Sequence, residues 1–147
     1  KGKCFATLAG QQGFSEAPQF EGSSCLSRER YDYMFQKRLL EEHYRTYGGS
    51  YAWVRAGLRA SREQMRRENL AKIKVPVLLF AAGCDHMVDN GAIGRFAEET
   101  ERTKLFSMPD SRHEIFNADE RTRVKYYDEI FRFIKEEEVK DYENKNE

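Results

Sequence analysis

Two side chains of this sequence, a carboxylate and an imidazole, are placed so that they could move protons together. Asp85 lies in a short loop directly after the uncharged residues 75–82, and His113 follows a second, shorter apolar segment. A carboxylate that orients a histidine, with that histidine as the base, is half of a nucleophile–base–orienter triad. The residue types therefore favour acid–base catalysis, provided that the fold brings the two side chains together.

The elements that must position these residues are two strands and the helix between them. Residues 75–82 carry no charge and are too few to span a membrane, so they are typical of a strand covered on both faces. Residues 90–100 have apolar side chains at helical spacing, and residues 103–108 have the pattern of a second strand. Strand, helix and strand within about 35 residues predict an α/β fold with a right-handed βαβ unit and parallel strands.

Catalytic groups of parallel α/β sheets gather beyond the carboxyl ends of the strands. Asp85 follows the end of the first predicted strand, and His113 follows the end of the second. Neighbouring strands lie about 5 Å apart, so their loops can bring a carboxylate and an imidazole into contact. We therefore expect a hydrogen bond between Asp85 and His113, at the rim of a cleft.

Four segments of the chain resemble one branch of the α/β-hydrolases. The acidic loop with its strand and the histidine loop resemble the C-terminal part of such enzymes, and two upstream segments resemble the helical cap of bacterial lysophospholipase L2 proteins. In chain order the four segments are residues 20–31, 48–54, 75–89 and 111–116. The similarity covers nearly the whole chain and is greatest for the lysophospholipase and monoacylglycerol-lipase branch.

The resemblance implies an activity and a role for each of the two residues. It implies a serine hydrolase that cleaves lysophospholipid or monoacylglycerol-like lipid esters without a cofactor, with Asp85 as the triad acid and His113 as the triad base. Acid before histidine is the order that α/β-hydrolases use, with the nucleophile further upstream. The resemblance also places the nucleophile serine, the oxyanion-hole loops and most of the sheet before Lys1, so the missing N-terminal part of the core would be a partner of this chain.

Other ionisable residues of the same loops have simpler explanations. Asp89 directly precedes Asn90 and Gly91, and is better placed to cap the following helix than to contact His113. His86 is adjacent to Asp85 and points elsewhere on an extended loop, while His43 lies among charged residues. The three histidines do not have the spacing of metal ligands, so we expect no metal site.

Two serines come close to the G-x-S-x-G nucleophile motif. Ser15 and Ser50 both lie in a G-x-S-x-A sequence, but the motif requires a sharp turn between a buried strand and a helix. Ser15 has no strong strand before it, and Ser50 is explained as the N-cap of a helix. We expect neither to be the nucleophile.

Two other functions are compatible with the same residues. An epoxide hydrolase or dehalogenase would share the fold and the histidine but would use a carboxylate nucleophile. A non-catalytic helical interaction module would be favoured if Asp85 and His113 proved to be far apart.

Composition excludes several classes of partner. The 147 residues include 25 basic and 25 acidic side chains, so no net field attracts nucleic acid. Three cysteines without C-x-x-C spacing (Cys4, Cys25 and Cys84) indicate reduced thiols in a cytoplasmic protein rather than disulfides or a zinc site.

No segment is typical of a signal peptide or a membrane span, and a peripheral contact with the membrane stays open. Because Lys1 is not a methionine, we expect that it is not the native start, and an upstream segment could carry a targeting signal.

The chain divides by pattern into three parts. Residues 1–72 are expected to form a helical cap that shares a limited interface with the rest. Its main helices are expected over residues 27–47 and 50–68, with Ser27 and Ser50 as their N-caps. Residues 73–136 form the α/β core, and residues 137–147 form a charged tail that frays in solvent. The aromatic residues of the cap could line an acyl-chain tunnel but more often form a core between helices: Phe14, Phe20, Tyr31, Phe35, Tyr51 and Trp53.

The last predicted helix begins after His113. Asn117 followed by Glu120 is typical of a capping box at its start. Four apolar residues then recur at helical spacing and are expected to lie against the sheet: Val124, Tyr127, Phe131 and Ile134.

Overall fold

The computed structural model describes residues 6–11, 13–46 and 48–144 of the chain. Its helices (α, or η for a 3-10 helix) and strands are, in chain order, α1 (Arg28–Leu40), η1 (Glu42–Tyr44), α2 (Tyr51–Gln64), α3 (Arg67–Leu70), β1 (Val77–Ala82), α4 (Asn90–Glu99), β2 (Thr103–Met108), η2 (Ile115–Asn117) and α5 (Glu120–Asn144). Cys4 and Tyr47 lie outside the described residues.

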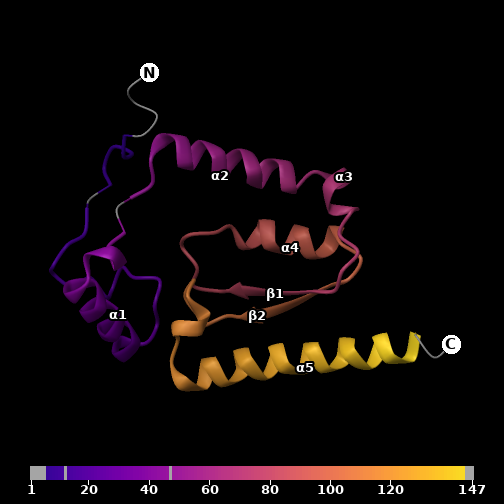
Figure 1. Ribbon diagram of the computed structural model, residues 1–147. Coiled ribbons are helices and arrows are strands. Elements are labelled where there is room, and N and C mark those ends of the chain that lie inside the picture. The colour runs from indigo at the N-terminus through magenta and orange to yellow at the C-terminus, as the bar shows by residue number, and fades with distance from the viewer. Residues whose placement is uncertain (1–5, 12, 47, 145–147) are drawn as a thin grey trace.

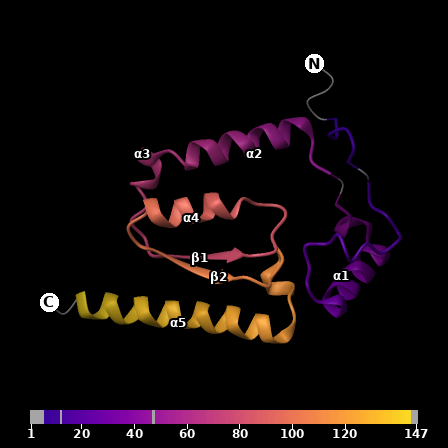
Figure 2. The same cartoon turned by 180° about the vertical axis from the view of Figure 1, so that it is seen from behind.

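The two strands form the predicted parallel pair, so the α/β fold class is confirmed. β1 pairs with β2 in register from Val77 opposite Thr103 to Ala82 opposite Met108. Figure 1 shows α4 on one face of the pair and α5 on the other, with α2 beyond α4. The view from behind in Figure 2 shows the same layers, and both views place α1 past the carboxyl ends of the strands. The loops after β1 and β2 therefore face the N-terminal half of the chain.

The apolar core lies at the carboxyl ends of the strands. Ala82 ends β1, Met108 ends β2, and Ile115 lies in the loop beyond them; all three are buried together. The half-buried rings of Phe80 and Phe106 make an edge-to-face contact beside this cluster, with centroids 5.7 Å apart. Because this core packs directly under the two loops, it fixes the points at which they leave the sheet.

Three of the four helix caps were predicted correctly. Ser27 Oγ accepts a hydrogen bond from the backbone N–H of Arg30, and Ser50 Oγ accepts one from that of Trp53. The expected start of α5 was wrong. Asp119, not Asn117, caps this helix, accepting from the N–H of Thr122 at 3.0 Å. Asn117 is itself the last residue of η2, whose turn the sequence pattern did not indicate.

The first helix ends earlier than its apolar spacing predicted. α1 stops at Leu40, where the backbone of Glu41 becomes extended. The side chain of Arg45 folds back and donates to the carbonyls of Arg38 and Leu39, at 2.9 and 3.0 Å. These carbonyls would otherwise lack partners at the helix end, so Arg45 acts as a C-terminal cap that sequence spacing alone does not reveal.

The face of α5 that contacts the sheet differs from the predicted one. Tyr126 packs on Phe80, with ring centroids 4.6 Å apart. Glu129 is buried, and its carboxylate lies 2.8 Å from both Lys104 Nζ and Arg132 Nη1. The packing of Tyr126 and the paired charge of Glu129 fix the rotation of the helix. The four residues expected against the sheet are therefore exposed: Val124, Tyr127, Phe131 and Ile134.

The charged segment that was expected to fray from residue 137 is helical over most of its length. α5 continues to Asn144. Glu137, whose side chain is only 18% exposed, lies 2.8 Å from Arg102 Nη2 and 2.6 Å from Lys140 Nζ. The ion pair with Arg102 holds the helix against the start of β2, and the pair with Lys140 lies within the helix. The polarity of the segment did not predict this docking.

The N-terminal half is mainly helical, as expected, and backbone hydrogen bonds join it to the core. Ser27 N–H donates to the carbonyl of Asn117 at 3.2 Å, and Glu114 N–H donates to the carbonyl of Ser24 at 3.0 Å. The division at residue 72 stays a prediction. No helix within the described part of the chain is long and apolar enough to cross a membrane.

Candidate catalytic site

The site begins with two loops that are held to one another by backbone hydrogen bonds. Gly83 N–H donates to the carbonyl of Met108, and Cys84 N–H donates to that of Ser111, each at 2.9 Å. The chains approach so closely that a Cβ built at Gly83 would lie 2.1 Å from the carbonyl oxygen of Pro109. The loops that carry Asp85 and His113 therefore have little freedom to move apart.

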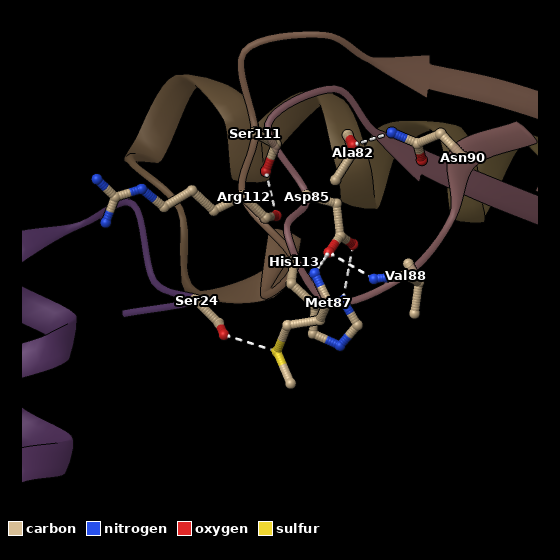
Figure 3. Close-up of polar contacts among 9 residues, drawn as sticks. All are labelled: Ser24, Ala82, Asp85, Met87, Val88, Asn90, Ser111, Arg112 and His113. Carbon is tan, nitrogen blue, oxygen red and sulfur yellow. Dashed lines mark hydrogen bonds and ion pairs between the residues drawn. The ribbon is translucent and has the colours of Figure 1, made fainter. Parts of the chain in front are cut away.

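The predicted contact between Asp85 and His113 is present. His113 Nδ1 lies 2.7 Å from Asp85 Oδ2, as Figure 3 shows. The carboxylate side chain is 3% exposed, whereas the imidazole is 38% exposed. A buried acid behind a solvent-facing histidine is the arrangement of an orienting group and a base. The catalytic role of the two residues stays a prediction.

The second oxygen of Asp85 is also occupied. Asp85 Oδ1 accepts hydrogen bonds from the backbone N–H groups of Met87 at 2.7 Å and Val88 at 3.2 Å. Burial, the largest influence, raises the pKa of Asp85, but the hydrogen bonds from His113, Met87 and Val88 together hold that pKa below its ordinary value of 3.8. Asp85 is therefore a carboxylate, with no proton to donate, at neutral pH.

This ionised carboxylate determines which nitrogen of His113 is free. A carboxylate only accepts hydrogen bonds, so Nδ1 of His113 must be the donor in the contact with Asp85. In the neutral ring the unprotonated nitrogen is then Nε2. The hydrogen-bond network thus assigns the Nδ1–H tautomer, which leaves Nε2 able to accept a proton.

The competing residues have the structural roles that the sequence suggested. Asp89 Oδ1 accepts from the N–H of Gly91 at 2.8 Å and caps α4. His43 and His86 are both exposed. No cluster of metal-binding side chains occurs in the part of the chain that the structure describes.

Neither serine of the two near-motifs contacts His113. Ser15 Oγ is engaged with the backbone of Ala17, and Ser50 Oγ accepts from the N–H of Trp53. Within residues 6–11, 13–46 and 48–144, the hydrogen bonds of the His113 side chain go to Asp85 alone.

Sequence reasoning missed two residues that support the site. Asn90 Nδ2 donates to the carbonyl of Ala82 at 2.8 Å and so holds the end of β1. Arg112, which directly precedes His113, binds backbone carbonyls of the N-terminal half. The position of Asn90 directly after a helix cap was a weak signal for its role. The sequence contains no signal for the role of Arg112.

Two parallel strands, with an acid after the first and a histidine after the second, define the C-terminal part of an α/β-hydrolase. The comparison with protein families agrees. Residues 21–120 match the model of the family described as serine aminopeptidase, S33. Because this match covers more than half of the chain, the chain belongs to that family of α/β-hydrolases. No curated protein and no solved structure matches the chain.

Proposed function

We propose that the chain supplies the acid and the base of a serine hydrolase that cleaves lysophospholipid or monoacylglycerol-like esters. The observation that carries the proposal is the 2.7 Å contact between the buried carboxylate of Asp85 and the exposed imidazole of His113. The substrate class rests on the resemblance of residues 20–31 and 48–54 to the caps of lysophospholipases. Such substrates lie in membranes, so we infer that the enzyme contacts the membrane peripherally. The three cysteines without C-x-x-C spacing favour the cytoplasm as its location.

In the proposed mechanism each residue has one task. His113 Nε2 takes the hydroxyl proton of the nucleophile serine as that oxygen attacks the ester carbonyl, and returns the proton to the leaving alcohol. Asp85 keeps Nδ1 protonated and stabilises the imidazolium that forms. Water then repeats the same steps and releases the fatty acid. The serine and the oxyanion-hole donors are proposed to come from residues preceding Lys1.

The aromatic side chains of the N-terminal half divide into two groups. Tyr31 stacks on Phe35 and Phe20 packs edge-on against Tyr31, with centroids 5.9 and 5.4 Å apart, which supports a core role for these three. Tyr51 and Trp53 on α2 are 45% and 71% exposed. We propose these two, rather than the clustered rings, as candidates for contact with an acyl chain.

The test uses the protein extended to include the residues before Lys1. We expect hydrolysis of a monoacylglycerol and of a lysophosphatidylcholine. Asp85→Asn should lower kcat by about 10⁴-fold, the loss seen when a triad histidine takes the wrong tautomer. His113→Gln removes the base itself and should lower kcat by about 10⁶-fold. Asp89→Asn and His86→Gln are matched controls that should leave kcat near wild type, since Asn caps a helix about as well as Asp.

Three results would point elsewhere. Cleavage of an aminoacyl anilide in preference to either ester would favour the peptidase activity named in the family description. Opening of an epoxide without labelling by a fluorophosphonate would favour a carboxylate nucleophile. Full activity of both His113→Gln and Asp85→Asn would overturn the proposed triad.

A further inference from the structure

The backbone on the N-terminal side of His113 is held by one arginine. Arg112 Nη1 lies within hydrogen-bond distance of three carbonyl oxygens, those of Phe20 at 3.2 Å, Ser23 at 3.2 Å and Cys25 at 3.1 Å. Its guanidinium also lies over the ring of Phe20, 5.5 Å from the centroid. Residues 20–25 thus wrap around a cation whose own backbone is covalently joined to the candidate base.

The same segment contacts the other side of His113 and the loop of Asp85. Glu114 N–H donates to the carbonyl of Ser24 at 3.0 Å. The hydroxyl of Ser24 donates to Met87 Sδ at 3.0 Å, and the N–H of Met87 is the closer of the two that bind Asp85 Oδ1. Figure 3 shows this path from Ser24 through Met87 to Asp85, with the side chain of Arg112 directed away from the imidazole.

Residues 20–25 are themselves held by the core. Cys25 Sγ lies 2.9 Å from the carbonyl of Asn117, to which Ser27 N–H also donates. Arg30 Nε donates to the side-chain oxygen of Asn117 at 3.3 Å. Arg112 therefore joins the histidine loop to residues 20–25, a segment that is itself held to the core through Cys25.

We propose that Arg112 is a positioning residue that, through residues 20–25, sets the backbone at His113 so that Nδ1 meets the carboxylate of Asp85. The role rests on the proposed function. Misplacement of a reacting group by about 1 Å can cost 10²-fold in rate, and a shift of that size would break the 2.7 Å contact. Arginine suits the position because its guanidinium is always charged and planar, so Nη1 can meet the carbonyl oxygens while the group lies over the ring of Phe20.

The test reads the tautomer of His113 in the 147-residue chain, which requires no turnover. Two-bond ¹⁵N–¹H spectra at a pH well above the usual range of histidine report which ring nitrogen carries the proton, and the His113→Gln variant assigns the signal. Wild type should show the Nδ1–H form. In Arg112→Gln the Nδ1–H population should fall and the commoner Nε2–H form should appear, with a smaller shift in Arg112→Lys.

Arg45→Gln is the matched control. Arg45 also binds backbone carbonyls and lies over a phenylalanine, Phe14, at 5.0 Å, but it does so at the end of α1. The Arg45→Gln variant should lose about as much unfolding free energy as Arg112→Gln and leave the tautomer of His113 unchanged. If Arg112→Gln does not fold, the folded Arg112→Lys variant decides.

The outcomes separate the two proposals. A wild-type tautomer retained in the folded Arg112 variants overturns the positioning role alone, as does an equal shift in Arg45→Gln. A wild-type chain without the Nδ1–H form contradicts the pairing of Asp85 with His113 on which both proposals depend. Failure of the extended protein to cleave esters, with the tautomer responding to Arg112 as expected, contradicts only the proposed reaction.

Discussion

Asp85 and Asp89 show how two aspartates of one loop acquire different roles from their partners. Asp89 is exposed and caps α4 through one backbone N–H, whereas Asp85 has a buried side chain that binds two N–H groups and an imidazole. The second arrangement satisfies both carboxylate oxygens, which burial of a charge requires. Solvation and hydrogen bonding, rather than residue type, therefore identify the candidate acid.

The lowered pKa of Asp85 leads to a prediction about stability and pH. A carboxyl group whose pKa is lower in the folded than in the unfolded state stabilises the fold above the unfolded pKa, and this contribution is lost as the pH falls through the folded pKa. We expect wild type to be more stable than Asp85→Asn at neutral pH, with the difference shrinking below about pH 4. Urea unfolding monitored by circular dichroism at several pH values measures it. A difference that grows in acid would contradict the prediction.

The described cysteines should differ in reactivity. Cys25 is 4% exposed and its Sγ contacts two backbone carbonyls, while burial raises the pKa of its thiol. Because the thiolate is the reactive form, Cys25 should be alkylated slowly by iodoacetamide at neutral pH. Cys84 is exposed and should react first. Peptide mass spectrometry over time measures both rates, and equal rates in the folded chain would contradict the burial of Cys25.

At the scale of elements, sequence patterns succeeded where residues of the element and its cap decide, and failed where a partner outside the element does. The bounds of the strand at 103–108 and the capping role of Asp89 were predicted correctly, because apolar pattern and capping are local. The end of α1 depends on Arg45, and the buried face of α5 depends on Glu129 meeting Lys104 across the fold. No spacing within a helix reports such partners.

The close approach of the two loops makes Gly83 the glycine of the site that a side chain should harm. Gly83→Ala would force a methyl group against the carbonyl of Pro109, a backbone atom, so we expect a loss of about 1–3 kcal/mol in unfolding free energy. Gly94→Ala within α4 is the matched control. A Cβ there meets no atom within 4 Å, and the change should stabilise by about 0.5–1 kcal/mol. Thermal unfolding of both variants compares them, and a harmless Gly83→Ala would mean that the loops can separate.

For the molecule as a whole, the candidate site lies where the N-terminal half meets the α/β unit. Residues 20–25 bind both loops that follow the strands, and the family match begins at residue 21 and extends past His113. The sequence predicted the two catalytic candidates from strand order. It could not predict this junction, because hydrogen bonds from Arg112 to backbone carbonyls leave no trace in the residue types of residues 20–25.

The 147-residue chain by itself is expected to have negligible activity on esters. His113 has its orienting acid, but Ser15 Oγ and Ser50 Oγ are occupied in a turn and a helix cap, so neither is in place to form an acyl-enzyme. Loss of one oxyanion-hole donor alone costs about 3–4 kcal/mol of transition-state stabilisation, so a base without its hole should contribute little. We expect no labelling by a fluorophosphonate and no turnover of a short-chain aryl ester until the residues preceding Lys1 are supplied. Robust turnover by this chain that disappears in Ser15→Ala or Ser50→Ala would identify that serine as the nucleophile and contradict the proposal that the nucleophile lies upstream.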